Sequence, residues 1–396
     1  MKIVHLCLAC FFPDHYAYQE NLLPKYHKAL GHDVEVIAST LSFDKNGKPC
    51  YLTKTGSYQN EYDIKVTRLP YRNPVRLWRV LRRYSGTCDA LMRAGPDLLF
   101  IHGCQFLDAD LVVRYIRSHP GIRVFVDNHA DFSNSAGNWL SLHILHRLIW
   151  RHTARELLPY TEKFYGVLPA RVDFLTEQYG LPPEKCELLV MGADDELVEE
   201  AFSSNARKRI RDEYHIKDDD FLVITGGKID RWKTQTLRLM EAVREIESKR
   251  LRLIVFGSIA PELREEFDRL VDGVKVQYVG WVQASETYNY AAAADLAVFP
   301  GRHSVFWEQV AGQGIPLLVK DWPGTHHVDL GGNAIFLKES STAEIRDVLQ
   351  RLLDHPEELQ HMKDVAAQEG MRVFSYRDIA RRCIASVAVP DADGNS

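Results

Sequence analysis

Short apolar segments alternate with amphipathic segments along nearly the whole chain. Residues 2–9 (KIVHLCLA) and 32–39 (HDVEVIAS) are apolar runs of strand length. Between them an apolar side chain recurs every four positions from Leu22 to Leu30, and Gly31 follows, which is typical of a helix with a glycine stop. The chain is therefore predicted to begin as strand, helix, strand.

The same rhythm continues to the middle of the chain and starts again after it. The first half predicts strands at 63–70, 96–103, 122–129, 165–170 and 186–194, and helices at 74–94, 108–118 and 139–157. The second half predicts strands at 221–227, 251–257, 275–282, 296–301, 315–321 and 334–338, with helices at 234–249, 261–271, 285–294 and 341–370. Apolar strands separated by amphipathic helices indicate parallel sheets covered on both faces.

A charged stretch at 194–220 separates the two series and places a boundary near residue 200. Two such series predict an α/β protein of two doubly wound, Rossmann-like domains that face each other across a cleft. The expected divisions are a first domain at 1–197, a second at 198–370, a final helix at 371–390 and a flexible tail at 391–396.

Composition and charge narrow the class of protein. The 396 residues are 45% hydrophobic and 26% charged, as in soluble globular proteins. The net charge of −5 argues against a dedicated nucleic-acid binder, which would carry a broad basic surface. No apolar run is long enough to span a bilayer, and residues 1–16 are interpreted as a first strand, not a signal peptide.

Cysteine usage fits a reducing cytoplasm, because the seven cysteines are odd in number and scattered. The spacing of Cys7 and Cys10 would suit a redox or zinc site, but no second pair accompanies them. We interpret both as buried thiols that pack as small apolar residues.

The turn at residues 226–233 carries the most informative chemistry. The apolar strand ends at Thr225, two glycines follow, and a helix begins near Thr234. Backbone N–H groups at such a turn and at the helix start favour an anion. Lys228 and Lys233 lie on either side of the turn, where both amines can reach one phosphate group. The alternative is an ordinary strand, turn and helix with two solvated lysines.

The segment RHSVFWEQVAGQGIP, residues 302–316, joins a polar loop to a short helix that ends at Gly314. Its one carboxylate is Glu308, and His303 and Ser304 precede it. This segment is either a donor-substrate loop or merely a helix on a globular domain, and its residues alone leave both interpretations open.

In order and spacing, these motifs resemble the retaining, family-4-type glycosyltransferases (glycosyl transferases group 1) of the GT-B fold. The second domain of that family opens with a strand, Gly-Arg-Leu and Glu-Lys-Gly, where this chain has Gly227-Lys228-Ile229 and Arg231-Trp232-Lys233. The segments KALGHDVEVIA, GPDLLFIHG, LVMGADDE and YVGWVQASETYNYAAAADLAVFPG resemble further elements, so the likeness covers residues 1 to about 385.

The resemblance implies roles for residues of the second domain. Gly227, Lys228 and Lys233 would hold the donor diphosphate, and Trp281 and Val282 would lie beside the nucleotide base. The final helix would cross back to the first domain, and closure about a hinge near its start would exclude water.

The donor loop departs from the family pattern, which has a pair of glutamates here. Glu308 can stand for the second, on the ribose, with Gln309 as a rival alignment. The first glutamate is absent, and His303 and Ser304 are expected to contact the sugar in its place.

The first domain offers candidates for catalysis and for the acceptor. His129 ends a predicted strand, and in the family a histidine here lies beside the reacting carbon, where it would position the donor and stabilise charge. The alternative is a histidine that only caps a strand end. Asp127 and Asp131 flank it as candidate acceptor contacts, and Tyr16 and Tyr18 could stack on an acceptor sugar or form a packed turn.

Asp108-Ala109-Asp110 has the form of a metal-binding Asp-x-Asp motif, but acidic residues are also expected at a helix start. We favour the helix start. Because two lysines would neutralise the phosphates and no ligand cluster stands out, we expect no metal and no cofactor.

Arginines gather with aromatic residues at 72–86 and 143–158. Such segments could lie on an anionic membrane and meet a lipid-linked acceptor, although we favour solvated helix faces that cover a sheet.

The sequence therefore predicts a glycosyltransferase that moves a sugar from a nucleotide-diphosphate sugar, with a UDP-sugar as the first candidate, to a glycan, glycolipid or small-molecule acceptor. Retention of anomeric configuration is implied by the resemblance, and transfer without a metal is expected because the two lysines would neutralise the phosphates. The alternatives are a degenerate, non-catalytic partner that binds a nucleotide sugar, and a sugar-nucleotide epimerase on the same fold. We expect a cytoplasmic protein, with peripheral contact at the inner face of the membrane as a second interpretation.

Overall fold

The computed structural model describes residues 1–44, 48–132, 135, 139 and 141–385. The chain divides into two compact units, Met1–Val190 with Ile379–Ser396, and Met191–Asp378. The sequence placed these two divisions after residues 197 and 370, and the predicted tail lies outside the described residues. Each unit is described by itself.

An eight-stranded sheet forms the centre of the first unit, with strand order β10-β9-β8-β7-β1-β2-β6-β5. Neighbouring strands are parallel except β5 with β6. The strands are β1 (Lys2–Cys7), β2 (Asp33–Ser39), β5 (Gly56–Gln59), β6 (Lys65–Leu69), β7 (Leu98–His102), β8 (Arg123–Asn128), β9 (Lys163–Gly166) and β10 (Cys186–Leu188). A separate hairpin pairs β3 (Leu41–Phe43) with β4 (Pro49–Tyr51).

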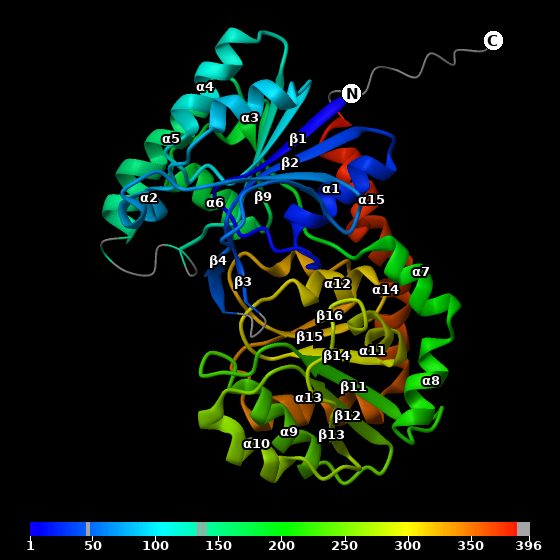
Figure 1. Ribbon diagram of the computed structural model, residues 1–396. Helices are drawn as coiled ribbons and strands as arrows, with labels where there is room; N and C mark the ends of the chain where they lie inside the picture. Colours follow the sequence, from blue (N-terminus) through cyan, green and yellow to red (C-terminus); the bar gives the residue numbers. More distant parts are fainter. Residues whose placement is uncertain (45–47, 133–134, 136–138, 140, 386–396) are drawn as a thin grey trace, which may run out of the picture. The chain divides into compact units, whose positions relative to one another are not determined.

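Helices lie on both faces of this sheet (Figure 1), as the alternating pattern predicts. They are α1 (Gln19–Ala29), α2 (Val75–Leu81), α3 (Thr87–Ala94), α4 (Ala109–Ser118), α5 (Arg151–Leu157) and α6 (Pro169–Glu177), with a π-helix at Ser141–Trp150 and α15 (Tyr376–Arg382) from the end of the chain. In the described part of the chain, no helix is long and apolar enough to span a bilayer.

Four local predictions for the first unit need correction. The strand expected at 165–170 ends at Gly166, and α6 begins at Pro169. The single helix expected at 74–94 is two helices, because Arg82 and Gly86 both take left-handed φ angles, of 53° and 88°, between α2 and α3. The strand expected at 186–194 ends at Leu188. Asp108 precedes α4 without capping it; its buried carboxylate accepts hydrogen bonds from Thr87 Oγ1 (2.5 Å) and from the N–H of Tyr84 (3.1 Å).

The cysteines behave as expected from the sequence. All seven are free; Cys7 is buried and Cys10 is half-buried. Burial raises the pKa of the Cys10 thiol, as expected for a thiol that packs as an apolar group.

A six-stranded sheet forms the centre of the second unit, with order β13-β12-β11-β14-β15-β16 and every neighbouring pair parallel. Its strands are β11 (Phe221–Gly226), β12 (Leu251–Phe256), β13 (Val276–Tyr278), β14 (Leu296–Phe299), β15 (Leu317–Lys320) and β16 (Ala334–Leu337). Its helices are α7 (Asp195–Ser203), α8 (Ala206–Glu213), α9 (Gln235–Glu245), α10 (Arg264–Leu270), α11 (Thr287–Ala293), α12 (Phe306–Gly312), α13 (Thr342–Asp354) and α14 (Pro356–Phe374). Because the strands run parallel, the loops after β11, β13, β14 and β15 gather at one edge of this sheet.

Polar side chains interrupt the apolar strands of the first unit at a few buried positions. β7 is buried along its whole length and ends in His102, and His5 lies in the middle of β1. The strand register sets His102 beside Asp127 of β8. A buried polar side chain is costly unless it is hydrogen-bonded, so these residues require partners.

Two glycine turns of the second unit touch backbone to backbone. Gly257 has a φ of 117°, and a Cβ placed on it would collide with the carbonyl group of Gly227. We expect Gly257→Ala to lower the free energy of unfolding by about 1–3 kcal/mol, through backbone strain and this clash. Urea denaturation checks the value. Gly273→Ala is the control, because its φ of 73° is also left-handed but its Cβ would meet open space; equal losses in the two variants would contradict the clash.

Candidate functional site

The turn after β11 is shaped by its glycines. Gly227 has a φ of 112°, which favours glycine, and a Cβ on Gly226 would collide with the ring of Phe256. A Cβ on Gly227 would lie 3.6 Å from the ring of Phe306 and 3.7 Å from the Nζ of Lys233. The side chain of Lys233 therefore folds back over the turn, just before α9 begins.

The two candidate phosphate-binding lysines differ in their surroundings. Lys233 is half-buried, and desolvation lowers the pKa of its amine, although Asp230 acts in the opposite sense. The side chain of Lys228 is 73% exposed, and its Nζ lies 3.6 Å from Asp230 Oδ2. The structure thus holds the amine of Lys233 against the turn and that of Lys228 in solvent beside Asp230, and the contact of both amines with one phosphate stays a prediction.

Aromatic side chains stand exposed on the loops at the same edge of the sheet. Trp281 follows β13 and is 70% exposed, with Val282 half-buried beside it. Trp232 is 52% exposed, and the guanidinium of Arg302, after β14, lies 4.7 Å from its ring centroid. These loops present flat apolar surfaces and a cation on which a nucleotide base can stack.

The donor loop expected from the sequence folds around Glu308. The Oε1 of Glu308 accepts hydrogen bonds from the Nε2 of His303 at 2.7 Å and from the Nε2 of His327 at 2.8 Å. Glu308 is completely buried, whereas the side chain of His303 keeps 11% of its surface exposed and Ser304 is half-buried next to it. His303 therefore covers the carboxylate and presents its own ring at the surface.

Burial and charge set the ionisation of Glu308. Desolvation raises the pKa of its carboxyl, but His303 and His327 outweigh it and hold the pKa well below the ordinary value. The Oε2 atom is buried and accepts no hydrogen bond from the described residues. The expected contact between Glu308 and a ribose is not accessible in this structure. Gln309, the rival alignment, is also buried and donates to Thr287 Oγ1 at 2.8 Å.

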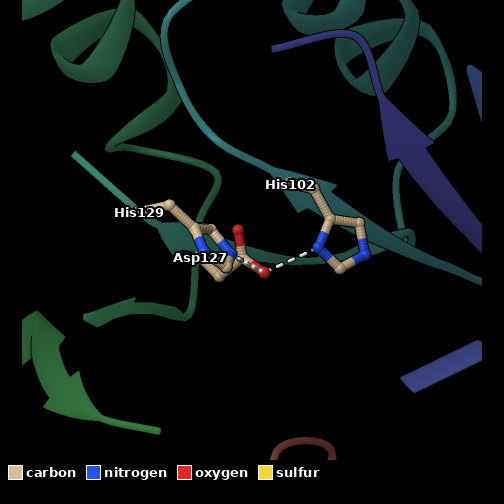
Figure 2. Close-up of side chains that lie close together, drawn as sticks. All are labelled: His102, Asp127 and His129. Carbon is tan, nitrogen blue, oxygen red and sulfur yellow. Dashed lines mark hydrogen bonds and ion pairs between the residues drawn. The ribbon is translucent and has the colours of Figure 1, made fainter. Parts of the chain in front are cut away.

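A second carboxylate lies between two histidines in the first unit. Asp127 Oδ2 accepts a hydrogen bond of 2.6 Å from His102 Nδ1, and the Nε2 of His129 lies 3.5 Å from the same oxygen (Figure 2). The Nε2 of His129 also lies 3.7 Å from Glu20 Oε1. Asp127 and His102 are fully buried and His129 is 29% exposed, so Asp127 is not the acceptor contact proposed from the sequence.

The charges of this group follow from its geometry. Burial lowers the pKa of His102, but Asp127 and other neighbours outweigh it and raise the pKa to about 9. Burial likewise lowers the pKa of His129, while Glu20 and Asp127 raise it above the ordinary value. For Asp127 burial raises the pKa, and the two histidines bring it well below the ordinary value. At neutral pH the Asp127 carboxylate is therefore ionised and is held by the His102 imidazolium, with His129 beside it.

The predicted acceptor residues are engaged with neighbours. The rings of Tyr16 and Tyr18 lie 5.4 Å apart, and Tyr16 stacks on Phe43 at 5.6 Å. Desolvation raises the pKa of Tyr18 to about 12. The tyrosines thus form a packed turn, and stacking on an acceptor stays a prediction. Asp131 is buried, and its Oδ2 accepts from Arg171 Nε at 3.1 Å.

Two groups have the residue types of a metal site, with ligand atoms within 4.8 Å of one another: His102, Asp127 and His129, and His303, Glu308 and His327. Two ligands bonded to a tetrahedral zinc ion at about 2.0–2.1 Å would lie roughly 3.3 Å apart. The three shortest distances within these groups are 2.6, 2.7 and 2.8 Å, which are hydrogen-bond lengths. In this structure the histidines of each group therefore form hydrogen bonds with its carboxylate.

The second unit contains the region that is similar to a known family. Residues 220–355, which include the Lys233 turn and the His303 loop, match the family model described as glycosyl transferases group 1. The second unit carries a glycosyl transferases group 1 domain. The expected class of enzyme is thereby confirmed, whereas the roles of single residues in the group 1 domain stay predictions.

Solved structures share the fold over nearly the whole chain. Sucrose-phosphate synthase from Thermosynechococcus elongatus is 14% identical, with a TM-score of 0.66 and 98% of each chain covered. HepE from Anabaena, in complex with UDP, is 13% identical, with a TM-score of 0.67 and coverage of 98% and 99%. UDP-GlcNAc 2-epimerase from Neisseria meningitidis, bound to UDP-GlcNAc, is 14% identical, with a TM-score of 0.64 and coverage of 98% and 100%.

At these identities the likeness shows the fold alone, and it confirms the expected architecture of two Rossmann-like units of the GT-B type. A comparison with curated proteins finds no match.

Two residues of these groups were not expected from the sequence. His327 lies after β15, and no spacing rule links it to Glu308 of the group 1 domain. His102 ends an apolar strand, and a histidine at a buried strand position is the signal that could have revealed it. Its partner could then have been found from the register of neighbouring parallel strands.

We expect Glu308→Gln to lower the free energy of unfolding by about 1–3 kcal/mol at pH 7, because two histidines lose a charged acceptor. A carboxyl whose pKa is lowered in the folded state stabilises above its unfolded pKa and loses that contribution as the pH falls. The difference from the wild type should therefore shrink as the pH falls into the ordinary titration range of a glutamate. Urea denaturation at several pH values checks this.

The exposed Glu265→Gln variant is the control for a simple change of charge. A Glu308→Gln protein as stable as the wild type at pH 7, or a difference that grows in acid, would contradict the ionised, hydrogen-bonded carboxylate.

Proposed function

We propose that this chain transfers a sugar from a nucleotide-diphosphate sugar to a glycan, glycolipid or small-molecule acceptor. A UDP-sugar is the first donor to test. The observation that carries the proposal is the half-buried amine of Lys233, held over the glycine turn of the group 1 domain. A desolvated cation over a glycine turn at the carboxyl edge of a parallel sheet is a favourable place for a diphosphate.

The rest of the donor is assigned to the loops at the same sheet edge. Trp281 and Val282 are proposed to contact the base, and His303 and Ser304 the sugar. Glu308 is proposed to act through His303, because it accepts the Nε2 proton of that ring and so fixes its orientation. Lys228 would reach the phosphates only by leaving Asp230, and we assign it a smaller share of the binding.

We propose that His129 is the catalytic residue and that transfer proceeds with retention and without a metal. Glu20 and Asp127 raise its pKa and so favour the imidazolium form, which can donate a hydrogen bond to a sugar hydroxyl or to the departing phosphate. Neutralisation of the diphosphate by Lys233 would take the place of a divalent cation. The protein is proposed to act in the cytoplasm in the synthesis of a polysaccharide or related glycan.

Peripheral membrane contact is proposed through α2. No residue of this helix is buried, and Leu77 and Val80 are 48% and 57% exposed between arginines. A lipid-linked acceptor would be met at such a surface.

An epimerase is the second candidate, because UDP-GlcNAc 2-epimerase shares the fold. An epimerase would convert its sugar nucleotide without any acceptor, whereas the proposed enzyme would need one. Incubation with UDP-GlcNAc alone, followed by NMR of the sugar, separates the two.

We expect Lys233→Ala to weaken binding of the preferred nucleoside diphosphate about tenfold or more, which corresponds to ~1.4 kcal/mol for each factor of ten. The physical reason is the loss of a charge-assisted contact to a phosphate. Calorimetry with UDP, GDP, ADP and dTDP measures the affinity. Lys249→Ala is the control, because Lys249 is an exposed lysine beyond the far end of α9.

Unchanged nucleotide affinity in Lys233→Ala would contradict the proposal that the diphosphate binds at this turn. If none of the four nucleotides binds the wild type, the degenerate, non-catalytic interpretation is favoured.

We expect His129→Ala to reduce turnover of the donor by about a hundredfold, in line with the loss of one positioned proton donor, while nucleotide binding is retained. Donor turnover is followed by release of the nucleoside diphosphate, and binding by calorimetry. The exposed His152→Ala variant controls for the loss of a histidine. Turnover at the wild-type level would exclude His129 from the reaction.

A further inference from the structure

Three buried histidines form a continuous hydrogen-bonded chain through the first unit. It runs from Ala380 O of α15 to His27 Nε2 (3.0 Å), from His27 Nδ1 to His5 Nε2 (2.9 Å), and from His5 Nδ1 to His102 Nε2 (2.9 Å). It ends where His102 Nδ1 donates to Asp127 Oδ2 at 2.6 Å. All three rings are completely inaccessible to solvent.

The two acceptors at the ends of this histidine chain, Ala380 O and Asp127 Oδ2, fix the number of protons in it. A carbonyl oxygen and an ionised carboxylate both accept hydrogen bonds and donate none. The four contacts therefore need four N–H protons on three rings, whereas three neutral imidazoles supply only three. One ring must be an imidazolium.

A neutral histidine chain would keep the bond from His102 to Asp127 but would need the two protons between the rings to point the other way. His27 Nε2 would then carry a lone pair and could accept only from the thiol of Cys383, whose Sγ is 3.5 Å away. That lone pair would face Ala380 O at 3.0 Å, which sets two acceptors against each other. The geometry therefore favours an Nε2–H on His27 and the charged chain.

The position of the extra proton follows from the neighbouring charges. Burial lowers the pKa of His5 well below its ordinary value and that of His27 to about 3. Only His102 contacts a carboxylate, and this contact outweighs its burial. The other charged or titratable side chains that face the chain are those of Cys7, Glu20 and His129 near His102, and of His32 and Cys383 near His27.

We propose that His5, His27 and His102 form a proton-sharing chain with one excess proton held at His102, and that this imidazolium fixes the Asp127 carboxylate beside His129. His102 is then a positioning residue, and His5 and His27 set its protonation from the side of α15. Asp127 is held further by Gln19 Nε2 at 3.3 Å and by the N–H of Gly103 at 3.1 Å. Figure 2 shows His102 and His129 around this carboxylate.

The link to His129 rests on the proposed function, whereas the protonation of the chain does not. Both can be measured without catalysis, so a failure to find glycosyl transfer would leave the test intact.

The protonation is tested by ¹⁵N NMR of the full-length protein labelled at the histidine rings, with signals assigned from single His→Gln variants. At pH 7 we expect N–H on both nitrogens of His102, and on Nε2 alone in His27 and His5. The second proton of His102 should be lost near pH 9. A chelator should leave the spectrum unchanged.

Three results would overturn the proposal. The first is N–H on Nδ1 alone in all three rings, which is the neutral chain. The second is a His102 that carries one proton at pH 7. The third is a spectrum altered by the chelator, which would show a metal ion in place of the proton.

The positioning role is tested by the titration of His129 in His102→Gln. Removal of a neighbouring positive charge should raise the pH midpoint of His129 by about one pH unit. Cys383→Ser, which leaves the chain intact, is the control and should show the wild-type midpoint. An unchanged midpoint in a folded His102→Gln protein would contradict a charged His102 that acts on His129 through Asp127.

Discussion

Each unit of this protein buries one ionised carboxylate next to two histidines. Asp127 is approached by His102 and His129, and Glu308 by His303 and His327. A buried carboxylate without partners would cost several kcal/mol, and the histidine contacts offset much of that cost. The same contacts leave one imidazole of each group partly at the surface, already oriented and fixed in its hydrogen bonding.

Both buried carboxylates and their histidines lie near the carboxyl ends of parallel strands, where such sheets bind ligands. Asp127 and His102 lie at the carboxyl ends of adjacent strands, and Glu308 follows the carboxyl end of β14. The Lys233 turn belongs to the same edge of the second sheet. The group 1 domain thus has a cation, exposed aromatic rings and an oriented histidine on neighbouring loops.

The sequence predicted the architecture more fully than the site. Apolar strands alternating with amphipathic helices are sufficient to indicate two doubly wound sheets, because burial on both faces imposes that pattern. The prediction of a single helix at 74–94 was wrong because two residues with left-handed φ angles interrupt it, although the alternation of apolar and polar residues continues across them. Glu308 could be singled out as a carboxylate, but its burial under His303 depends on His327 from a distant loop.

The histidine chain illustrates the same limit. His5, His27 and His102 come from β1, α1 and β7, and only the packing of these elements sets their rings in line. From the sequence they are single polar residues in apolar surroundings, each of which needs some partner. Which partner, and how many protons the group holds, depends on Ala380 and Asp127 at its two ends.

We have proposed that the group 1 domain binds a donor diphosphate at the turn after β11. A crystal structure of the full-length protein with UDP tests it most directly. We expect the diphosphate to lie against Gly227 and the amine of Lys233, with the ring of His303 exposed nearby and Glu308 still covered. A diphosphate bound elsewhere, with the Lys233 turn empty, would contradict it.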